Sequence, residues 1–477
     1  MNELVIPNSY HIFHFPFLVK GKINKFHWEK MVFDPKKSIE NYNQHSYFYD
    51  FAENTLFNME KSIVEAYLYT KLTKDSIYSI QVLNDVQPYD LHIDHITLKE
   101  FTDFGVGVLS FHLANFNYSA EEDILKINEY GRRIYPQFLD RANLVLGTKN
   151  VFLANRITLN NLLVPDIQED FQEFDRLPLK ETYLPKHITE LIGENIKEVL
   201  DDRMFVCCLY GNPDKMNELK IWESENYSFI QNDFWYSFLF VDKKDPTCQS
   251  KTLRSKLVSE ATNDRWIDYG TLYGVSRYSF VLLLGNKPQD FFFGKLLDDL
   301  KLFYSQMAIL CLVQRATLLK FSAEITNISN DGIESKEVSG LYKRYIRFRN
   351  QLYFREVTAQ EQGIELYDLL QKQMRLEKEV KDLDEEIAEL NSYIQTEEQG
   401  GLTKVATYFL PASFIAAILA FVSDKAYFQF DEISLTPMNG YFNVTPRYVL
   451  LFSGVCLGFV IGYLFSNPKK LKNLWKK

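Results

Sequence analysis

Two long stretches without a charged residue lie near the end of this chain of 477 residues. Residues 405–423 form a run of 19, and residues 448–468 form a run of 21. As a helix that rises about 1.5 Å per residue, either run is about 30 Å long, the thickness of the hydrocarbon core of a bilayer. The sequence therefore predicts two membrane-spanning helices, joined by residues 424–447.

A cluster of lysines sets the expected orientation of these helices. Five of the nine residues 469–477 are lysines, and positive charge beside a span stays on the cytoplasmic side. The first ten residues include Glu3 and Pro7 and lack the basic and apolar regions of a secretory signal. We therefore expect a multi-pass protein of the cytoplasmic (inner) membrane, with both termini in the cytoplasm and residues 424–447 on the opposite side.

A third apolar run is shorter. Residues 302–314 are 13 uncharged residues between Lys301 and Arg315. This length is too short to span a bilayer and is typical of a helix in the core of a soluble domain. We therefore expect residues 302–314 to be buried in protein.

The amino-acid composition indicates which partners the protein can bind and in which compartment it folds. The chain holds 53 basic and 63 acidic residues, for a formal net charge of -10, and residues 405–477 contribute 7 basic and 3 acidic residues. The part before residue 405 is therefore strongly acidic, which argues against a duplex nucleic acid as partner. The five cysteines form no CxxC pair, and this usage fits a reducing, intracellular compartment.

Short runs rich in β-branched and aromatic residues recur along residues 1–285 and predict strands. Between them, residues 187–200 show helical spacing of apolar residues, and Ser119 with Glu122 forms a capping-box pattern for another helix. This alternation predicts a domain of α/β or α+β type. The predicted strands are residues 76–83, 91–98, 106–113, 204–210, 236–241 and 275–284.

Residues 286–401 are predicted to be helical. Apolar helix-forming sequence continues to about residue 326, and the polar segment 327–337 then predicts a connection to a second helical arm. We expect one helix from about 338 to 399, about 90 Å long at 1.5 Å per residue, and association between copies of the chain. A coiled-coil seam in this arm would consist of Leu366, Leu369, Gln373, Leu376, Val380, Leu383, Ile387, Leu390 and Ile394.

The start of the first predicted span carries the most specific pattern, LTKVATYFLPASFIAAILAF at residues 402–421. It resembles the first transmembrane helix of the CorA family of divalent-cation channels. The order of parts also resembles that family: a cytosolic domain, a long stalk helix, two spans and a lysine-rich tail. The residues that match the family pattern are Leu402, Thr403, Ala406, Thr407, Phe409, Pro411, Phe414, Ile415 and Ala416.

The resemblance implies a homopentamer in which residues 402–423 surround a pore and residues 448–468 form an outer helix. Family members typically end the pore helix with a Gly-Met-Asn triplet that selects hydrated magnesium, and Ala420, Phe421 and Val422 take its place here. Magnesium or another divalent cation as permeant or bound ion is therefore an open expectation. The pore-lining residues implied by register are Thr396, Gln399, Leu402, Leu410, Ser413 and Ala417.

The large soluble domain and the missing triplet resemble a branch of the CorA family found beside type III CRISPR systems. This resemblance implies an antiviral membrane effector opened by a nucleotide second messenger, such as a conjugate of S-adenosylmethionine with AMP. Two alternatives stay open: a housekeeping transporter of magnesium or another divalent metal, and a membrane-anchored coiled-coil scaffold. The sequence lacks the GxSxG, HExxH and P-loop signatures, so we do not expect an enzyme.

Two groups of basic residues are candidates for binding a nucleotide. Arg132 and Arg133, with Tyr135 beside them, have the chemistry to hold a phosphate and stack on a base, although basic residues are also common at the C-terminal end of a helix. The second group lies in 338–355 and offers either a nucleotide site or pairing with the acidic domain of a neighbouring subunit. Its members are Lys343, Arg344, Arg347, Arg349 and Arg355.

Overall fold

The computed structural model describes residues 6–57, 63–82, 85–134, 154–171, 183–200, 203–223, 225–243, 246–287, 290–331 and 335–422. The chain forms two compact units. The first unit consists of Met1–Asn327 and Leu341–Asp384, and the second of Ile328–Gly340 and Glu385–Lys477. The helical part predicted at 286–401 is therefore divided between the two units.

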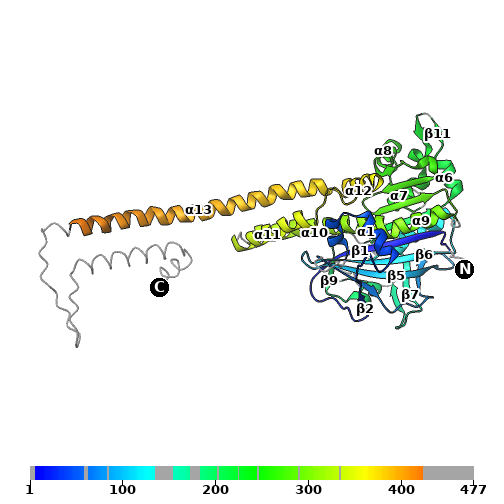
Figure 1. The fold of residues 1–477 in the computed structure, drawn as a ribbon, viewed down its shortest axis with the longest axis horizontal. Helices are drawn as coiled ribbons and strands as arrows, with labels where there is room; N and C mark the ends of the chain where they lie inside the picture. The colour runs from blue at the N-terminus through cyan, green and yellow to red at the C-terminus, as the bar shows by residue number, and fades with distance from the viewer. Residues whose placement is uncertain are drawn as a thin grey trace, which may run out of the picture. The chain divides into compact units, whose positions relative to one another are not determined.

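One large sheet is the scaffold of the first unit (Figure 1). In the described part of the chain it has 13 strands, and its main path runs β13-β14-β15-β10-β1-β6-β5-β4-β7-β8. Its paired strands are antiparallel except β10 and β15, so the unit is of the α+β rather than the α/β type. The strands are β1 (Ser9–Val19), β2 (Trp28–Lys30), β3 (Val64–Tyr69), β4 (Ile77–Val82), β5 (Tyr89–Phe101), β6 (Val106–Asn115), β7 (Ala154–Asn160), β8 (Ile167–Asp170), β9 (Ile196–Glu198), β10 (Phe205–Gly211), β13 (Thr262–Asn263), β14 (Thr271–Val275) and β15 (Ser279–Leu284).

Strand β1 lies inside the sheet, although it contains a proline. It pairs with β6 along one edge, while its other edge pairs with β10 as far as His14 and with β9 from Phe17 onward. Pro16 therefore stands between the two partners on that edge, where the missing N–H breaks no ladder. Because the segment contains a proline and two histidines, its sequence does not show the usual pattern of a strand. The strand was therefore not predicted.

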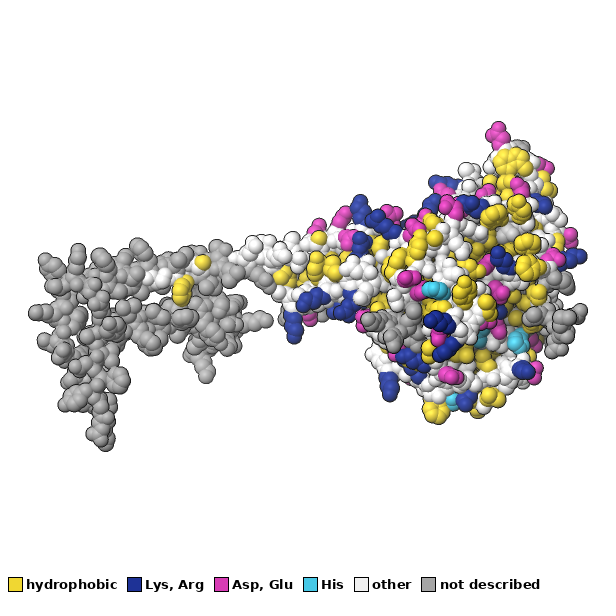
Figure 2. All heavy atoms as spheres, in the orientation of Figure 1, with side chains coloured by type: hydrophobic (Ala, Val, Ile, Leu, Met, Phe, Trp, Pro, Cys, Tyr) yellow, Lys and Arg dark blue, Asp and Glu magenta, His cyan; other side chains and the backbone are white. Residues whose placement is uncertain are grey.

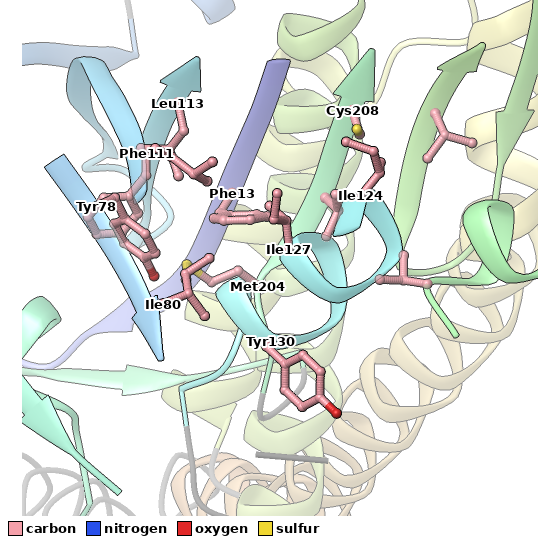
Figure 3. Packing of buried hydrophobic residues seen from close by; sticks show 14 of the residues in the cluster. Phe13, Tyr78, Ile80, Phe111, Leu113, Ile124, Ile127, Tyr130, Met204 and Cys208 are labelled. Atoms are coloured by element: carbon pink, nitrogen blue, oxygen red, sulfur yellow. The ribbon is translucent and has the colours of Figure 1, made fainter. Parts of the chain in front are cut away.

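The two faces of the sheet differ in chemistry. On one face, Phe13, Phe15 and Phe17 of β1 belong to the main hydrophobic cluster, which also contains the apolar sides of α3 (Glu121–Gly131) and α5 (Lys186–Ile192). Figure 3 shows Phe13 beside Ile127 of α3, with Tyr130 at the end of that helix. The other face is covered by the helical segment that follows β15 and carries several polar side chains.

That covering segment is a nearly unbroken helix of three parts: α9 (Phe291–Asp299), the π-helical segment η3 (Leu300–Tyr304) and α10 (Ser305–Asp331). Among the described residues, Phe291–Asn330 is the helix long and apolar enough to cross a membrane, but 89% of its apolar window is buried inside the protein. Residues 307–313 are all nearly inaccessible. The prediction that residues 302–314 belong to a buried core helix is confirmed.

The second helical arm is interrupted, which corrects the prediction of one helix from 338 to 399. It consists of α11 (Ser335–Gln351), α12 (Glu361–Met374) and α13 (Leu376–Val422). The chain leaves the helical conformation after α11, and Arg375 between α12 and α13 has a left-handed φ of 57°. Helix α13 alone has 47 residues and is about 70 Å long at about 1.5 Å per residue.

Four of the six predicted strands are confirmed as β4, β5, β6 and β10. The prediction of a strand at 236–241 is wrong, because this segment belongs to α7 (Asp233–Phe240) and its C-cap. The side chain of Asn232 accepts a hydrogen bond from the amide of Trp235 and starts the helix there. The strand predicted at 275–284 is confirmed only from Ser279 onward, as β15, because Val275 ends β14 and residues 276–278 connect the two strands. Aromatic content alone does not distinguish a short buried helix from a strand.

Two helix predictions also need correction. The predicted helix 187–200 ends at Ile192, because Gly193 takes a positive φ of 88° that stops the helix, and β9 follows. The predicted capping box is wrong, since α3 begins after Ala120 and no side chain caps it. The remaining short elements are α1 (Ile39–Tyr47), α2 (Asp50–Leu56), α6 (Pro213–Leu219), α8 (Lys251–Ala261), η1 (Ser228–Gln231), η2 (Ile267–Tyr269) and the hairpin of β11 (Trp222–Glu223) and β12 (Asn226–Tyr227).

Candidate functional site

Helix α13 carries all the residues that the sequence assigned to a pore. At 100° per residue, the six predicted positions fall within about a third of the helix circumference. Thr396, Gln399 and Ser413 are exposed in the single chain, and Thr396 donates a hydrogen bond to the carbonyl of Ser392 at 2.8 Å. The positions are Thr396, Gln399, Leu402, Leu410, Ser413 and Ala417.

The first predicted span is helical as far as Val422, and α13 passes through Gly400 and Gly401 without a break. Ala420, Phe421 and Val422, which replace the selectivity triplet, form the last turn of this helix. The second predicted span 448–468, the connector 424–447 and the lysine tail 469–477 lie outside the described residues.

The coiled-coil seam is buried within one chain. Val380, Leu383, Ile387 and Ile394 are nearly inaccessible without any second copy. Helix α11 covers the first part of the seam, because Tyr345 donates hydrogen bonds to Asp384 at 2.7 Å and to the carbonyl of Val380 at 3.3 Å. The seam therefore does not itself require association between copies, which removes one reason for expecting an oligomer.

Arg132 and Arg133 lie directly after α3, and both are buried, at 1% and 0% relative exposure. Each donates to a different oxygen of Glu129, Arg132 at 2.8 Å and Arg133 at 2.6 Å. A third guanidinium, that of Arg203, is 3.8 Å from the same carboxylate. Burial raises the pKa of Glu129, but attraction to the three arginines outweighs it and holds the pKa below its ordinary value.

This arrangement is first of all a buried ion pair. Glu129 occupies the position that a phosphate would need in order to bridge both arginines. Arg132 also donates to the carbonyl of Val241 at 3.2 Å, but its Nε and Nη1 have no hydrogen-bond partner in the described part of the chain. Its guanidinium carbon is 5.9 Å from the ring centroid of Tyr278. Phosphate binding here stays a prediction, and Tyr135 lies outside the described residues.

The second basic group is partly neutralised within its own chain. Arg344 pairs with Glu324 at 2.5 Å, Arg347 with Asp103 at 3.3 Å, and Arg349 with Asp384 at 3.4 Å. These three arginines therefore hold α11 against other elements of the first unit. Neither a nucleotide nor a neighbouring subunit is needed to account for them.

A buried polar layer between the sheet and the covering helix was missed by the sequence interpretation. His14 of β1 contacts the hydroxyl of Ser110 at 2.7 Å and that of Ser305 in α10 at 3.3 Å. Lys99 of β5 donates to Gln306 of α10 at 2.5 Å and to the carbonyl of Leu56 at 2.6 Å. Burial lowers the pKa of His14 to about 3 and that of Lys99 to about 7.

The π-helical segment adds a charged group to this layer. Lys301 in η3 pairs with Asp94 at 2.8 Å, and Tyr10 donates to the same carboxylate at 2.7 Å. Asp94 lies at the irregularity in β5 between Ile93 and His95, where the register with β6 shifts. A π segment in a long helix is often retained at functional positions, and here it brings Lys301 to the sheet. The sequence signal for this layer was the pair Tyr10 and His14, which share one face of β1, and it was visible only once β1 was recognised as a strand.

His11 and His14, two histidines of β1, do not form a metal site together. His11 contacts Asn128 at 2.7 Å on the α3 side of the sheet, whereas His14 contacts Ser110 on the opposite face. No group of three or more His, Cys, Asp or Glu side chains that could hold a metal ion occurs among the residues that the structure describes.

Comparison of the chain with protein-family models, with curated proteins and with solved structures finds no match.

Proposed function

We propose that this protein is a membrane ion channel, similar to the CorA family, whose first unit controls a pore formed by α13. In this account the chain is a homopentamer of the cytoplasmic membrane with both termini in the cytoplasm. The residues at 402–423 and 448–468 form the two spans, and the stripe from Thr396 to Ala417 lines the pore. Apolar rings at Leu402 and Leu410 would close the pore by dewetting.

The observation that carries this proposal is the continuity of α13. The helix begins in the first unit at Leu376 and continues without interruption into the uncharged run, ending at Val422. A rigid helix of this kind transmits a displacement of its first turns to its far end, which is what control of a pore by a soluble unit requires. A scaffold would not need the exposed polar positions Thr396, Gln399 and Ser413 along one side of that helix.

We propose further that the opening signal is a nucleotide second messenger and that the role is antiviral. This step rests on the resemblance to the CRISPR-associated branch of the CorA family. Arg132, with two nitrogens (Nε and Nη1) that lack a hydrogen-bond partner among the described residues, is the anchor that we favour for a phosphate. The alternative is a constitutive transporter of magnesium or another divalent cation, which would need no such anchor.

Ion flux through the purified full chain in sealed vesicles tests the proposal. Vesicles loaded with a potassium- or magnesium-sensitive dye are mixed with the salt alone or with salt plus the conjugate of S-adenosylmethionine with AMP. Flux only in the presence of the nucleotide supports the gated channel, and magnesium flux without it supports the transporter. Vesicles that contain inserted protein and stay tight under all conditions contradict both and favour the scaffold.

A further inference from the structure

Helix α13 exposes a stripe of four carboxylates shortly after it begins. Asp382, Glu385, Glu386 and Glu389 are spaced three and four residues apart and are all exposed. Like charges at this spacing repel each other along a helix. None of the four forms an ion pair within the described part of the chain, although Lys378 and Lys381 lie one turn before Asp382 and Glu385.

Helix α11 exposes the opposite charge. Lys336, Lys343 and Arg347 lie seven and four residues apart on its exposed side. Arg347 reaches Asp103, but Lys336 and Lys343 form no ion pair with any residue that the structure describes. Figure 2 shows Lys and Arg side chains in dark blue along this helix. The exposed side also carries Tyr342 and Ile346, which are 39% and 41% exposed, so it combines charge with apolar surface.

The two stripes cannot neutralise each other within one chain. Helix α11 contacts α13 through its buried side, where Tyr345 bonds Asp384 and the carbonyl of Val380. From the helical period, the basic stripe lies roughly 150° round α11 from its buried side, and the acidic stripe roughly 140° round α13 from the buried seam. Both stripes therefore point away from the contact that joins these helices.

We propose that the basic stripe of α11 in one copy binds the acidic stripe of α13 in the next copy. The two surfaces are different, so the contact is head-to-tail, and repetition of such a contact closes a ring when the rotation between copies returns to the start, as the proposed pentamer requires. A second copy is the favoured occupant because both halves lie on the same chain and carry opposite charge. The basic stripe spans about 16 Å and the acidic stripe about 10 Å at 1.5 Å per residue. This inference rests on the proposed oligomer and adds the surface that sets its order.

A zero-length carbodiimide cross-linker tests the contact, because it joins a lysine to a carboxylate only when the two touch. The full chain in mild detergent is prepared as an equal mixture of isotope-labelled and unlabelled copies. We expect mixed-isotope peptides that join Lys336 or Lys343 to the segment 382–389. The double variant K336R/K343R is the matched control, because arginine keeps the charge and the assembly but does not react. The contact is absent if cross-links between copies join other surfaces and none joins these.

Charge reversal gives an independent readout of the same contact. The variants K336E/K343E and E385K/E386K should each shift dissociation of the oligomer to at least tenfold higher protein concentration, and the quadruple variant should recover the original value. K256E, at an exposed lysine of α8, should change nothing. An oligomer that is indifferent to every reversal overturns the inference but leaves the channel proposal standing, whereas an original chain that is monomeric overturns the channel proposal itself. If EDTA dissociates the oligomer and K336E/K343E does not change its dissociation, the acidic stripe binds a divalent cation. This result also overturns the inference.

Discussion

The hydroxyl of Tyr345 lies 2.7 Å from a carboxylate oxygen of Asp384 and joins α11 to α13. Burial and this hydrogen bond raise the pKa of Tyr345. Asp384 also pairs with Arg349 at 3.4 Å and is the last residue of the first unit. The two hydrogen bonds of Tyr345 therefore fix the segment from which α13 continues toward the predicted membrane span.

The variant Tyr345→Phe removes both hydrogen bonds and leaves the ring packing in place. Because the hydroxyl has one proton, which the two acceptors share, we expect a total loss of about 1 kcal/mol of stability and faster hydrogen exchange of the amides at 380–388. Hydrogen exchange measured by mass spectrometry checks this, with Tyr342→Phe, at an exposed position of the same helix, as control. Equal exchange in Tyr345→Phe and the original protein would show that the hydroxyl does not hold α13.

Removing the two buried arginines should damage the fold. In Arg132→Ala/Arg133→Ala, Glu129 stays buried with Arg203 alone at 3.8 Å, and an unpaired buried charge costs about 3 to 5 kcal/mol. We expect a lower Tm and partial recovery when Glu129→Gln is added. Arg156→Ala, which breaks an exposed pair with Asp170, is the control and should change Tm little.

A test of ligand binding therefore needs a gentler change. Arg132→Lys keeps a positive charge beside Glu129 but removes the guanidinium N–H groups that have no partner among the described residues. If a phosphate binds there, calorimetry should show at least tenfold weaker nucleotide binding, with a Tm that falls less than in Arg132→Ala/Arg133→Ala. Undiminished affinity in a well-folded Arg132→Lys protein would exclude this anchor.

Acid should destabilise the first unit below neutral pH. Burial lowers the pKa of His187 from 6.5 to about 3, and neither of its ring nitrogens has a hydrogen-bond partner in the described residues. Between these two pH values the unfolded chain binds a proton that the folded chain does not, so stability falls as pH falls from 6.5 toward 3. The slope for one such proton is about 1.4 kcal/mol per pH unit.

The variant His187→Phe isolates this contribution. Its ring is apolar and of similar size, and it would sit among Tyr78, Phe111 and Phe171. We expect unchanged or higher stability at pH 7.5 and a smaller loss of Tm between pH 6.5 and 4.5 than in the original protein. His11, His14 and His112, whose pKa values burial also lowers, maintain the remaining slope. An identical pH profile of Tm in both proteins would show that His187 is not buried in the neutral form.

The sequence predicted the parts of the fold that depend on local patterns. Four strands and the buried helix at 302–314 could be recognised because their apolar residues are continuous or alternate regularly. Strand β1 could not, because the sheet arrangement that accommodates Pro16 involves β9 and β10, nearly two hundred residues away. The prediction of a strand at 236–241 was wrong for a related reason, because the helix cap at Asn232 and tertiary packing outweighed the β propensity of these residues.

The candidate sites show the same limit. The predicted pore residues come from the resemblance to the CorA family, and the helical spacing of α13 places them along one side of that helix. By contrast, the two adjacent arginines, Arg132 and Arg133, suggested an accessible phosphate site. No local pattern in the sequence shows that the carboxylate of Glu129, one turn earlier, accepts hydrogen bonds from both. The contact between Lys301 and Asp94 depends on a π segment and an irregular strand, neither of which has a sequence signature.

The proposed gate makes a prediction about resting leak. If Leu402 and Leu410 form apolar rings in the pore, then Leu402→Asn or Leu410→Asn should raise ion flux without any nucleotide by at least tenfold, because a polar ring stays wet. Dye-loaded vesicles measure this, and Tyr393→Asn, at an exposed position of α13 outside the predicted stripe, is the control. Tight vesicles with both leucine variants would place the gate elsewhere.

Electrical recording from the full chain in a planar lipid bilayer tests the central claim most directly. The account predicts discrete unitary current steps of uniform size, absent from bilayers without protein, whose open fraction rises when the nucleotide is added on the side of the first unit. Leu410→Asn should give the same steps without nucleotide. Protein that inserts as an oligomer but produces no unitary currents, with or without nucleotide and in both potassium and magnesium salts, would contradict the account.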